Sequence, residues 1–292
     1  MLNFQKVAII ARPDSIHLTN SIHELADMLE MMGITTFIDN NFLGSNQLNT
    51  PYKYCKVDDF LSEIELAIII GGDGTLLAAA RKIVSHNIPI IGINHGNLGF
   101  MTDIPANDML ETVKELIENH DNDIDERNLI SARVVRNDNI IYNSLALNDF
   151  VISRGLLSSM IEISISIDNE FVCTQKSDGL IITTPTGSTA YALASGGPIL
   201  HPASKSIAIV PICPQSMSNR PIVVSDNSEI QIMMLSKTEA VVHSDGQESF
   251  TILPNDLIII HKSNLPLRLL HAKNYSYYRT LRNKLHWAKR LS

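Results

Sequence analysis

A single carboxylate, that of Asp73, lies inside the glycine-rich sequence GGDGT at residues 71–75. An apolar run at 66–70 precedes this turn and a segment with helical periodicity follows it, so the turn joins a strand to the start of a helix. A helix N-terminus presents free N–H groups and glycine lets the backbone approach an anion closely, so we expect a phosphate-binding site here. A carboxylate beside phosphates is repelled unless it binds magnesium or accepts the proton of an attacking hydroxyl. This favours phosphoryl transfer over the alternative that Asp73 only caps the helix.

Two common phosphate-binding sequences do not occur in this turn. The pattern GxxxxGK[ST] is excluded because no lysine follows Gly74, and GxGxxG is excluded because position 77 is Leu77. The GGDGT sequence resembles a signature shared by NAD kinases, by lipid kinases of the diacylglycerol and sphingosine kinase type, and by phosphofructokinases. Other stretches of the chain must distinguish these families.

Three further stretches carry residues that could bind a nucleotide: GINHGNLGFMTD at 92–103, LNDF at 147–150, and SDGLIITTPTGSTAYALASGGP at 177–198. Singly, each has a structural explanation, as a strand end, a hairpin turn or a helix cap. Together and in this order they closely resemble the NAD kinase family, and the eight-residue match TPTGSTAY is very specific. Lipid kinases usually continue into an Asn-Glu pair soon after GGDGT, where this chain has LLAAAR. Phosphofructokinases would need a different second half.

The resemblance implies an enzyme that transfers the γ-phosphate of ATP to the 2′-hydroxyl of the adenosine ribose of NAD, giving NADP. Asp73 would be the catalytic residue that accepts or holds the proton of this hydroxyl, and Gly74 would press against the substrate. The resemblance also implies that NAD or ATP is bound by Asn148, Asp149, Lys176, Asp178, Thr189, Ala190, Tyr191, Ala194 and Gln247. Weaker candidates for the same site are Gly71, Gly72, Thr75 and Ser159. Relatives usually have glutamate at position 149 and often a basic residue at 159.

The same resemblance implies the partners. Magnesium would accompany ATP, with no direct protein ligand assigned to it, and the protein would form a homodimer or homotetramer. Two alternatives stay open: a lipid-type kinase with the GGDGT turn, and a non-catalytic dinucleotide sensor. A sensor would not need an acid at position 73, so the presence of Asp73 favours the enzyme.

The first part of the chain must position the GGDGT turn. Apolar strands are predicted at 6–11, 35–39, 66–70 and 89–94, with helices at 18–33 and 107–120 between or after them. Strands separated by helices imply right-handed crossovers and a parallel sheet covered on both faces. The stretch 40–55 has many turn residues and is predicted to be a surface loop.

Beyond residue 125 the pattern changes to short segments rich in β-branched residues. The segment 160–168 alternates strictly, as a strand with one wet face does, and the sequences NDN at 137–139 and DNE at 168–170 predict hairpin turns. We therefore expect an α/β domain at 1–125, a β-rich, sandwich-like domain at 126–266 with a helix at 189–197, and a basic, helical segment within 267–292 that returns to the first domain.

Composition narrows the range of partners. The 292 residues carry 31 acidic and 23 basic side chains, a net charge of −8, which argues against a nucleic-acid partner. No apolar run approaches the length that spans a bilayer, so no membrane partner is expected. The cysteines, Cys55, Cys173 and Cys213, lack CxxC spacing and are predicted to be reduced, buried thiols in a cytoplasmic protein.

Overall fold

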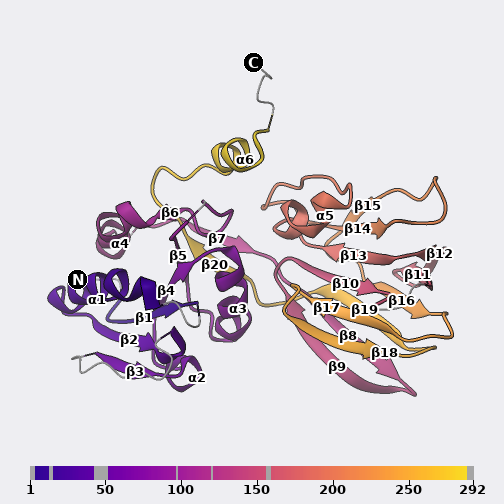
Figure 1. Ribbon diagram of the computed structural model, residues 1–292, viewed down its shortest axis with the longest axis horizontal. Coiled ribbons are helices and arrows are strands. Elements are labelled where there is room, and N and C mark those ends of the chain that lie inside the picture. The colour runs from indigo at the N-terminus through magenta and orange to yellow at the C-terminus, as the bar shows by residue number, and fades with distance from the viewer. Residues whose placement is uncertain are drawn as a thin grey trace. The chain divides into compact units, whose positions relative to one another are not determined.

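The computed structural model describes residues 4–12, 16–42, 52–96, 98–119, 121–155 and 159–287. The chain forms two compact units (Figure 1). Unit 1 consists of residues 1–126 and 267–292, and unit 2 of residues 127–266. The middle of the chain is therefore inserted into unit 1.

Unit 1 is built on a sheet with the strand order β3-β2-β1-β4-β5-β20-β7, and β6 pairs with β5. Strand β1 pairs in parallel with β2 and β4, and β5 pairs in parallel with β4, β6 and β20. This confirms the predicted α/β part with a parallel sheet. The strands are β1 (Lys6–Ala11), β2 (Thr35–Asp39), β3 (Lys53–Cys55), β4 (Leu66–Gly71), β5 (Ile90–Asn94), β6 (Ile104–Pro105), β7 (Ile124–Arg127) and β20 (Leu267–Leu270).

Helices cover both faces of this sheet. Alternate residues of β1 and β4 bury one face in a core shared with α1 and α4, and Figure 1 shows α2 and α3 on the other side of the strands. In α1 the buried residues Ile22, Leu25, Ala26 and Leu29 follow the helical repeat. The helices are α1 (Thr19–Met31), α2 (Val57–Phe60), α3 (Asp73–Ile83), α4 (Met109–Glu118) and α6 (Tyr277–Leu285), with short 3-10 turns η1 (Ile16–Leu18), η2 (Asn40–Phe42), η3 (Val84–His86) and η4 (Ala106–Asp108).

Unit 2 contains two antiparallel sheets, with the orders β15-β14-β13-β10-β17-β18 and β12-β11-β16-β19-β8-β9. One hydrophobic core combines side chains from both sheets, which confirms the β-rich, sandwich-like prediction. The strands are β8 (Ile130–Arg136), β9 (Asn139–Ala146), β10 (Asp149–Ser153), β11 (Ile161–Ile167), β12 (Glu170–Ser177), β13 (Gly179–Thr183), β14 (Ser206–Ile212), β15 (Ile222–Ser225), β16 (Ile230–Met234), β17 (Ala240–Ser244), β18 (Glu248–Ile252) and β19 (Leu257–Lys262).

Both predicted hairpin turns of unit 2 are confirmed. Asn137 and Asp138 have φ of 49° and 63° between β8 and β9, and Asp168 and Asn169 have φ of 52° and 66° between β11 and β12. Two successive left-handed residues suit the twist of a tight hairpin, and Asn and Asp tolerate this conformation.

Several sequence predictions need correction. The predicted loop 40–55 contains η2 and β3, because three residues with no apolar pattern pair with the edge of β2; residues 43–51 lie outside the described residues. The predicted helix 189–197 is reduced to η5 (Gly187–Thr189) and the four-residue α5 (Tyr191–Ala194), since the chain turns away at Gly196, where φ is +81°.

Smaller corrections concern the cysteines and the chain's basic end. Cys213 is exposed and Cys55 and Cys173 are half-buried, so the thiols are free but not buried as predicted. The predicted basic segment returns to unit 1 through β20, which pairs with β5, and then forms α6; residues 288–292 lie outside the described part of the chain. No helix in the described ranges is both long and apolar enough to cross a membrane.

Candidate active site

Asp73, the first residue of α3, has a carboxylate that accepts hydrogen bonds from five donors. Its Oδ1 accepts from the backbone N–H groups of Met101 (3.0 Å) and Thr102 (3.1 Å) and from the Thr102 hydroxyl (3.2 Å). Its Oδ2 accepts from the backbone N–H of Phe100 (2.9 Å) and from Nζ of Lys284 (3.2 Å). The carboxylate is thus held by a loop some 30 residues later in the chain and by the C-terminal helix.

These donors control the ionisation of Asp73. Burial by itself raises the pKa of the carboxyl group, but the three backbone N–H groups and the Lys284 ammonium outweigh burial and bring the pKa below its ordinary value of 3.8. Asp73 is therefore an anion at neutral pH. Because the hydrogen bonds run to residues outside α3, the alternative that Asp73 merely caps its own helix is wrong.

Glycines allow the loop at 98–102 to reach Asp73. A Cβ atom on Gly99 would overlap the Asp73 carboxylate and the Thr102 hydroxyl. A Cβ atom on Gly92 would overlap the backbone of residues 101 and 102. The glycines of the 92–103 stretch therefore provide close approach between the loop, strand β5 and the carboxylate.

Asn94, the last residue of β5, fixes the same loop. Its side-chain amide donates to the Thr102 hydroxyl (3.0 Å), and its amide oxygen accepts from the backbone N–H of Gly96 (2.7 Å). The Thr102 hydroxyl thus links Asn94 to the Asp73 carboxylate. Asn97, in the middle of the predicted stretch, lies outside the described residues.

A cavity of about 630 Å³ opens beside the glycine turn of unit 1. Gly71, Gly72, Gly74 and Thr75 line it, whereas Asp73 does not, because its carboxylate points to the 98–102 loop. The cavity lies at the carboxyl ends of β1, β4 and β5, where parallel sheets bind ligands. The weaker candidates Gly71, Gly72 and Thr75 are thereby brought together with Gly74 at one surface.

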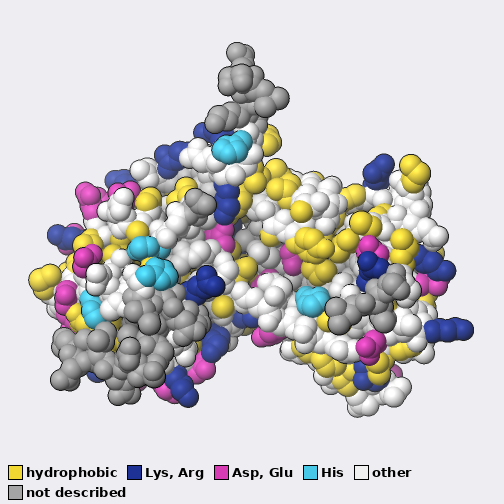
Figure 2. Space-filling view, in the orientation of Figure 1, with side chains coloured by type: hydrophobic (Ala, Val, Ile, Leu, Met, Phe, Trp, Pro, Cys, Tyr) yellow, Lys and Arg dark blue, Asp and Glu magenta, His cyan; other side chains and the backbone are white. Residues whose placement is uncertain are grey.

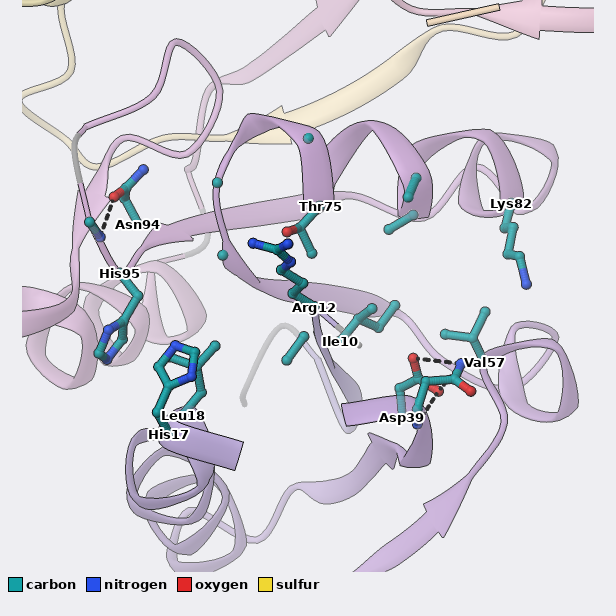
Figure 3. A pocket seen from close by; sticks show the side chains of 18 residues that line it. Ile10, Arg12, His17, Leu18, Asp39, Val57, Thr75, Lys82, Asn94 and His95 are labelled. Atoms are coloured by element: carbon teal, nitrogen blue, oxygen red, sulfur yellow. Dashed lines mark hydrogen bonds between the residues drawn. The ribbon is translucent and has the colours of Figure 1, made fainter. Parts of the chain in front are cut away.

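Polar side chains that sequence reasoning did not select line the rest of the cavity. Figure 3 shows Arg12 extending toward Thr75, His17 beside His95, and Lys82 at the far end. Arg12 is exposed and has no carboxylate partner among the described residues. Arg12 directly follows the first predicted strand, so the rule that ligands bind at the carboxyl ends of parallel strands could have identified it.

The cavity also contains one buried acid. Burial raises the pKa of Asp39, against the lowering effect of hydrogen bonds from Asn41 and Val57. Lys82, at the same end, forms an exposed ion pair with Asp58 at 3.0 Å. The charged side chains at the cavity are thus Arg12 at its centre and, at one end, Lys82 with its partner Asp58 and the buried Asp39.

In unit 2, the predicted pair Asn148 and Asp149 lies against a turn that contains Asp245. The Asp245 carboxylate accepts from the backbone N–H groups of Leu147 (3.0 Å), Asn148 (2.8 Å) and Asp149 (3.2 Å). Asp149 is 4% exposed, and burial together with repulsion from Asp245 raises its pKa to about 7. Sequence reasoning selected Gln247 from this turn and missed Asp245, although its Asp-Gly step is a turn signal.

The TPTGSTAY stretch packs directly on this pair. The hydroxyl of Thr184, its first residue, donates to the backbone oxygen of Leu147 (2.5 Å), next to the pair, and that of the preceding Thr183 to the backbone oxygen of Asn148 (3.0 Å). A Cβ atom on Gly187 would overlap the Asn148 carbonyl. Hydroxyls of this region therefore bind a neighbouring segment, and the Thr184 hydroxyl also accepts from the backbone N–H of Gly187 (3.1 Å) at the start of η5, as a cap would.

The remaining predicted residues of unit 2 lie at accessible positions. Lys176 lies 3.5 Å from Glu162, and Asp178 lies 3.4 Å from Arg154. Asp178 separates β12 from β13, which belong to different sheets, so the hairpin-turn alternative for this position is wrong. The exposed or half-buried candidates on the same unit are Ser159, Thr189, Ala190, Tyr191, Ala194 and Gln247.

These features are those of a two-unit nucleotide-binding protein with an ionised carboxylate in a glycine turn beside a cavity. Two family models match the chain: the ATP-NAD kinase N-terminal domain over residues 7–121, and the ATP-NAD kinase C-terminal domain over 147–272. An NAD kinase of Chromobacterium violaceum is 46% identical over 289 residues, which is 99% of this chain and 98% of that protein. An NAD kinase of Neisseria gonorrhoeae is 42% identical over 292 residues, with 99% and 98% coverage.

Solved structures show the same fold. A yeast NADH kinase complexed with NADH has a TM-score of 0.88 at 22% identity and covers 99% of this chain and 89% of its own. An NAD kinase from Archaeoglobus fulgidus in complex with ATP has a TM-score of 0.75 at 24% identity, with coverage of 96% and 98%. The chain belongs to the NAD kinase family and is a phosphotransferase, as the sequence resemblance implies. The comparisons do not favour the lipid-kinase or sensor alternatives.

Proposed function

We propose that this NAD kinase transfers the γ-phosphoryl group of ATP to the 2′-hydroxyl of the adenosine ribose of NAD. We further propose that the Asp73 carboxylate accepts a hydrogen bond from this hydroxyl. The observation that carries the assignment is the ionised Asp73 carboxylate in a glycine turn whose Gly72, Gly74 and Thr75 line a cavity of about 630 Å³, while the carboxylate itself faces a loop of N–H donors. A hydroxyl that donates to this carboxylate becomes oriented with its oxygen free to attack phosphorus.

The low pKa of Asp73 limits what it can do as a base. A carboxylate offers about four lone-pair positions and Asp73 already accepts from five donors, so a substrate hydroxyl must take the place of one of them. Asp73 would then hold the hydroxyl in line and accept its proton late in the transfer. General-base help of this kind is worth roughly 10² to 10⁴ in rate.

We assign the ATP triphosphate to the unit 1 cavity. The glycine turn and the N-terminus of α3 offer backbone N–H groups to phosphate oxygens, and Arg12 supplies a guanidinium that can bind two of them at once. Lys82 can add a second positive charge when it leaves its exposed ion pair with Asp58.

Magnesium would enter this site as part of the ATP substrate. The described residues contain no group of three or more His, Cys, Asp or Glu side chains suited to hold a metal ion, and the Asp73 carboxylate is already saturated. The residues of the cavity therefore do not fit a protein-held metal ion. The chain's own contribution is to bind and orient the two substrates.

Unit 2 supplies the proposed dinucleotide-binding residues. Asn148 and Asp149 would bind ribose hydroxyls or an adenine amine, and the exposed Tyr191 ring with Thr189, Ala190 and Ala194 offers a flat wall for a base. Asp178, Lys176 and Gln247 add polar groups that can leave their surface partners for substrate.

Two properties beyond the reaction belong to the same proposal. We propose a homodimer or homotetramer, because edge strands of unit 2 expose large apolar side chains, and Figure 2 shows many hydrophobic side chains on this unit. These side chains are Ile140, Ile141, Phe171, Val172, Ile222 and Val223. We also propose a cytoplasmic location, supported by three free cysteines.

The test is NADP formation from NAD, ATP and Mg²⁺ by wild type, Asp73→Asn and, as a matched control, Asp123→Asn, which changes an exposed carboxylate of the same unit. Asp73→Asn should lose about 10² to 10⁴ in kcat, while Asp123→Asn should equal wild type. Arg12→Met should raise the KM for ATP and leave the KM for NAD unchanged. A folded wild type that makes no NADP would refute the function, and an unchanged ATP KM in Arg12→Met would refute the assignment of the cavity.

A further inference from the structure

We propose that Lys284 is a positioning residue for this reaction: helix α6 carries its ammonium group to Asp73 and holds the carboxylate in place to receive the 2′-hydroxyl. The inference rests on the function proposed above, because it takes Asp73 as the reacting carboxylate. It assigns a role in the reaction to a residue 211 positions away in sequence.

The contact is specific to one carboxylate oxygen. Nζ of Lys284 lies 3.2 Å from Oδ2 of Asp73, and the two side chains are 35% and 23% exposed. The same Nζ lies 5.1 Å from the ring centroid of Phe100, whose backbone N–H donates to the same Oδ2 at 2.9 Å. The ammonium group is therefore fixed between a carboxylate and an aromatic face, which limits its motion more than a surface ion pair would.

Helix α6 is itself fixed to unit 1. The Ser276 side chain caps it by accepting from the backbone N–H of Arg279, and Thr280 and Leu281 are 4% and 3% exposed. The Tyr277 ring lies 6.4 Å from the Phe100 ring. The N-terminal end and the middle of the nine-residue helix are therefore held against unit 1, and Lys284 extends to Asp73 from the exposed last turn.

The segment that leads to α6 is tied down as well. The His271 ring lies between two carboxylates, with Nδ1 2.9 Å from Asp103 and Nε2 3.2 Å from Asp125, and it stacks on Tyr275 at 3.8 Å. The cluster thereby joins the C-terminal segment to Asp103, which precedes β6, and to Asp125, which lies in β7. The position of Lys284 is thus built into the fold.

Lys284 differs in kind from the other donors to Asp73. The other four donors are uncharged backbone N–H groups and a hydroxyl, all from residues 100–102. Among the groups in the described structure that donate to this carboxylate, Lys284 is the one that carries a formal charge. Its loss leaves Oδ2 with the Phe100 N–H as its one remaining donor and removes the positive charge beside the carboxylate, so the carboxylate is held less firmly to receive the hydroxyl.

The experiment is a double-mutant cycle on kcat with NAD, ATP and Mg²⁺. The variants are Lys284→Met, Lys284→Arg, Asp73→Asn and the double variant, with Arg282→Met as the control that removes an exposed cation from the same helix. All are first checked for the wild-type far-UV circular dichroism. Lys284→Met should lower kcat about tenfold to a hundredfold with both KM values changed less than about threefold. Lys284→Arg should recover most of the loss, and Arg282→Met should match wild type.

The decisive comparison is made in the Asp73→Asn background. If Lys284 acts through Asp73, Lys284→Met should change the residual kcat of that variant by less than about twofold. An equal loss in both backgrounds, or a Lys284→Met enzyme with wild-type kcat, would overturn the inference and leave the proposed function standing. Wild-type turnover by Asp73→Asn would overturn both the inference and the proposed role of Asp73, and would leave NADP formation standing as the function.

Discussion

Replacing Asp149 by asparagine should stabilise unit 2, and increasingly so as the pH rises. Asp149 is 4% exposed, and burial with repulsion from Asp245 raises its pKa from 3.8 to about 7. Below about pH 4 both folded and unfolded chains carry the proton and the raised pKa has no effect on stability. Between the two pKa values the folded chain keeps a proton that the unfolded chain loses, so the wild type loses stability with rising pH. Above about pH 7 the full loss of stability from ionising the buried Asp149 is present.

The size of this effect follows from the pKa change. Each pH unit corresponds to about 1.36 kcal/mol, so the cost approaches about 4 kcal/mol above pH 7. Asparagine has the shape of the protonated acid and carries no charge. The free energy of unfolding of Asp149→Asn should therefore exceed that of wild type by a margin that grows about 3 kcal/mol between pH 5 and pH 8 and is constant beyond.

The assay is urea unfolding followed by circular dichroism at half-unit steps from pH 4.5 to 8.5, without nucleotide. Asp138→Asn is the matched control, because it makes the same chemical change at an exposed hairpin turn of the same unit. Its difference from wild type should not vary with pH. A difference for Asp149→Asn that is flat across this range would refute the reasoning that burial and Asp245 oppose the charge on Asp149.

Two further predictions concern close packing and an ion pair between a half-buried arginine and a buried aspartate. Gly99→Ala should lower kcat at least tenfold with the fold retained, because the new methyl group overlaps the Asp73 carboxylate, whereas Gly96→Ala, with its nearest atom 3.8 Å away, should keep most activity. Arg136→Met should lower the urea midpoint more at pH 7 than at pH 3. Burial raises the pKa of Asp256, but hydrogen bonds from Arg136 at 2.8 and 2.7 Å bring it below 3.8, so the pair's contribution is lost as pH falls. A loss that is equal at both pH values would contradict this account.

Much of the fold could be predicted because local sequence and tertiary structure agree. Strands β1, β4 and β5 are continuous apolar runs, as buried parallel strands require, and the left-handed Asn and Asp residues mark both hairpins. Strand β3 could not be predicted, because three residues without an apolar pattern become a strand only by pairing with β2. The helix predicted at 189–197 is too long, because the small residues of this stretch are as compatible with a turn as with a helix.

The site was predictable where one segment carries the chemistry. Asp73 and its glycines were identified from the turn itself, whereas its donors come from residues 100–102 and 284, which only tertiary folding brings to it. Arg12 belongs to no sequence motif, and its proposed role in binding phosphate is inferred from the cavity that it lines. Asp245 was missed because its role is to accept backbone N–H groups of 147–149, a contact that spacing along the chain does not reveal.

The insertion of unit 2 between β7 and β20 determines the order in which the enzyme can mature during translation. Residues 1–126 emerge from the ribosome first, yet β20 and α6 are made only after all of unit 2. Until then the unit 1 sheet has an open position beside β5, and Asp73 lacks the Lys284 ammonium. The nascent chain therefore exposes an unpaired strand edge for the time needed to synthesise about 140 residues, roughly 7 to 28 seconds at usual elongation rates. The surroundings of Asp73 are completed soon after the sheet is closed, so a chain that ends before β20 keeps an unpaired strand edge and lacks the Lys284 ammonium at Asp73.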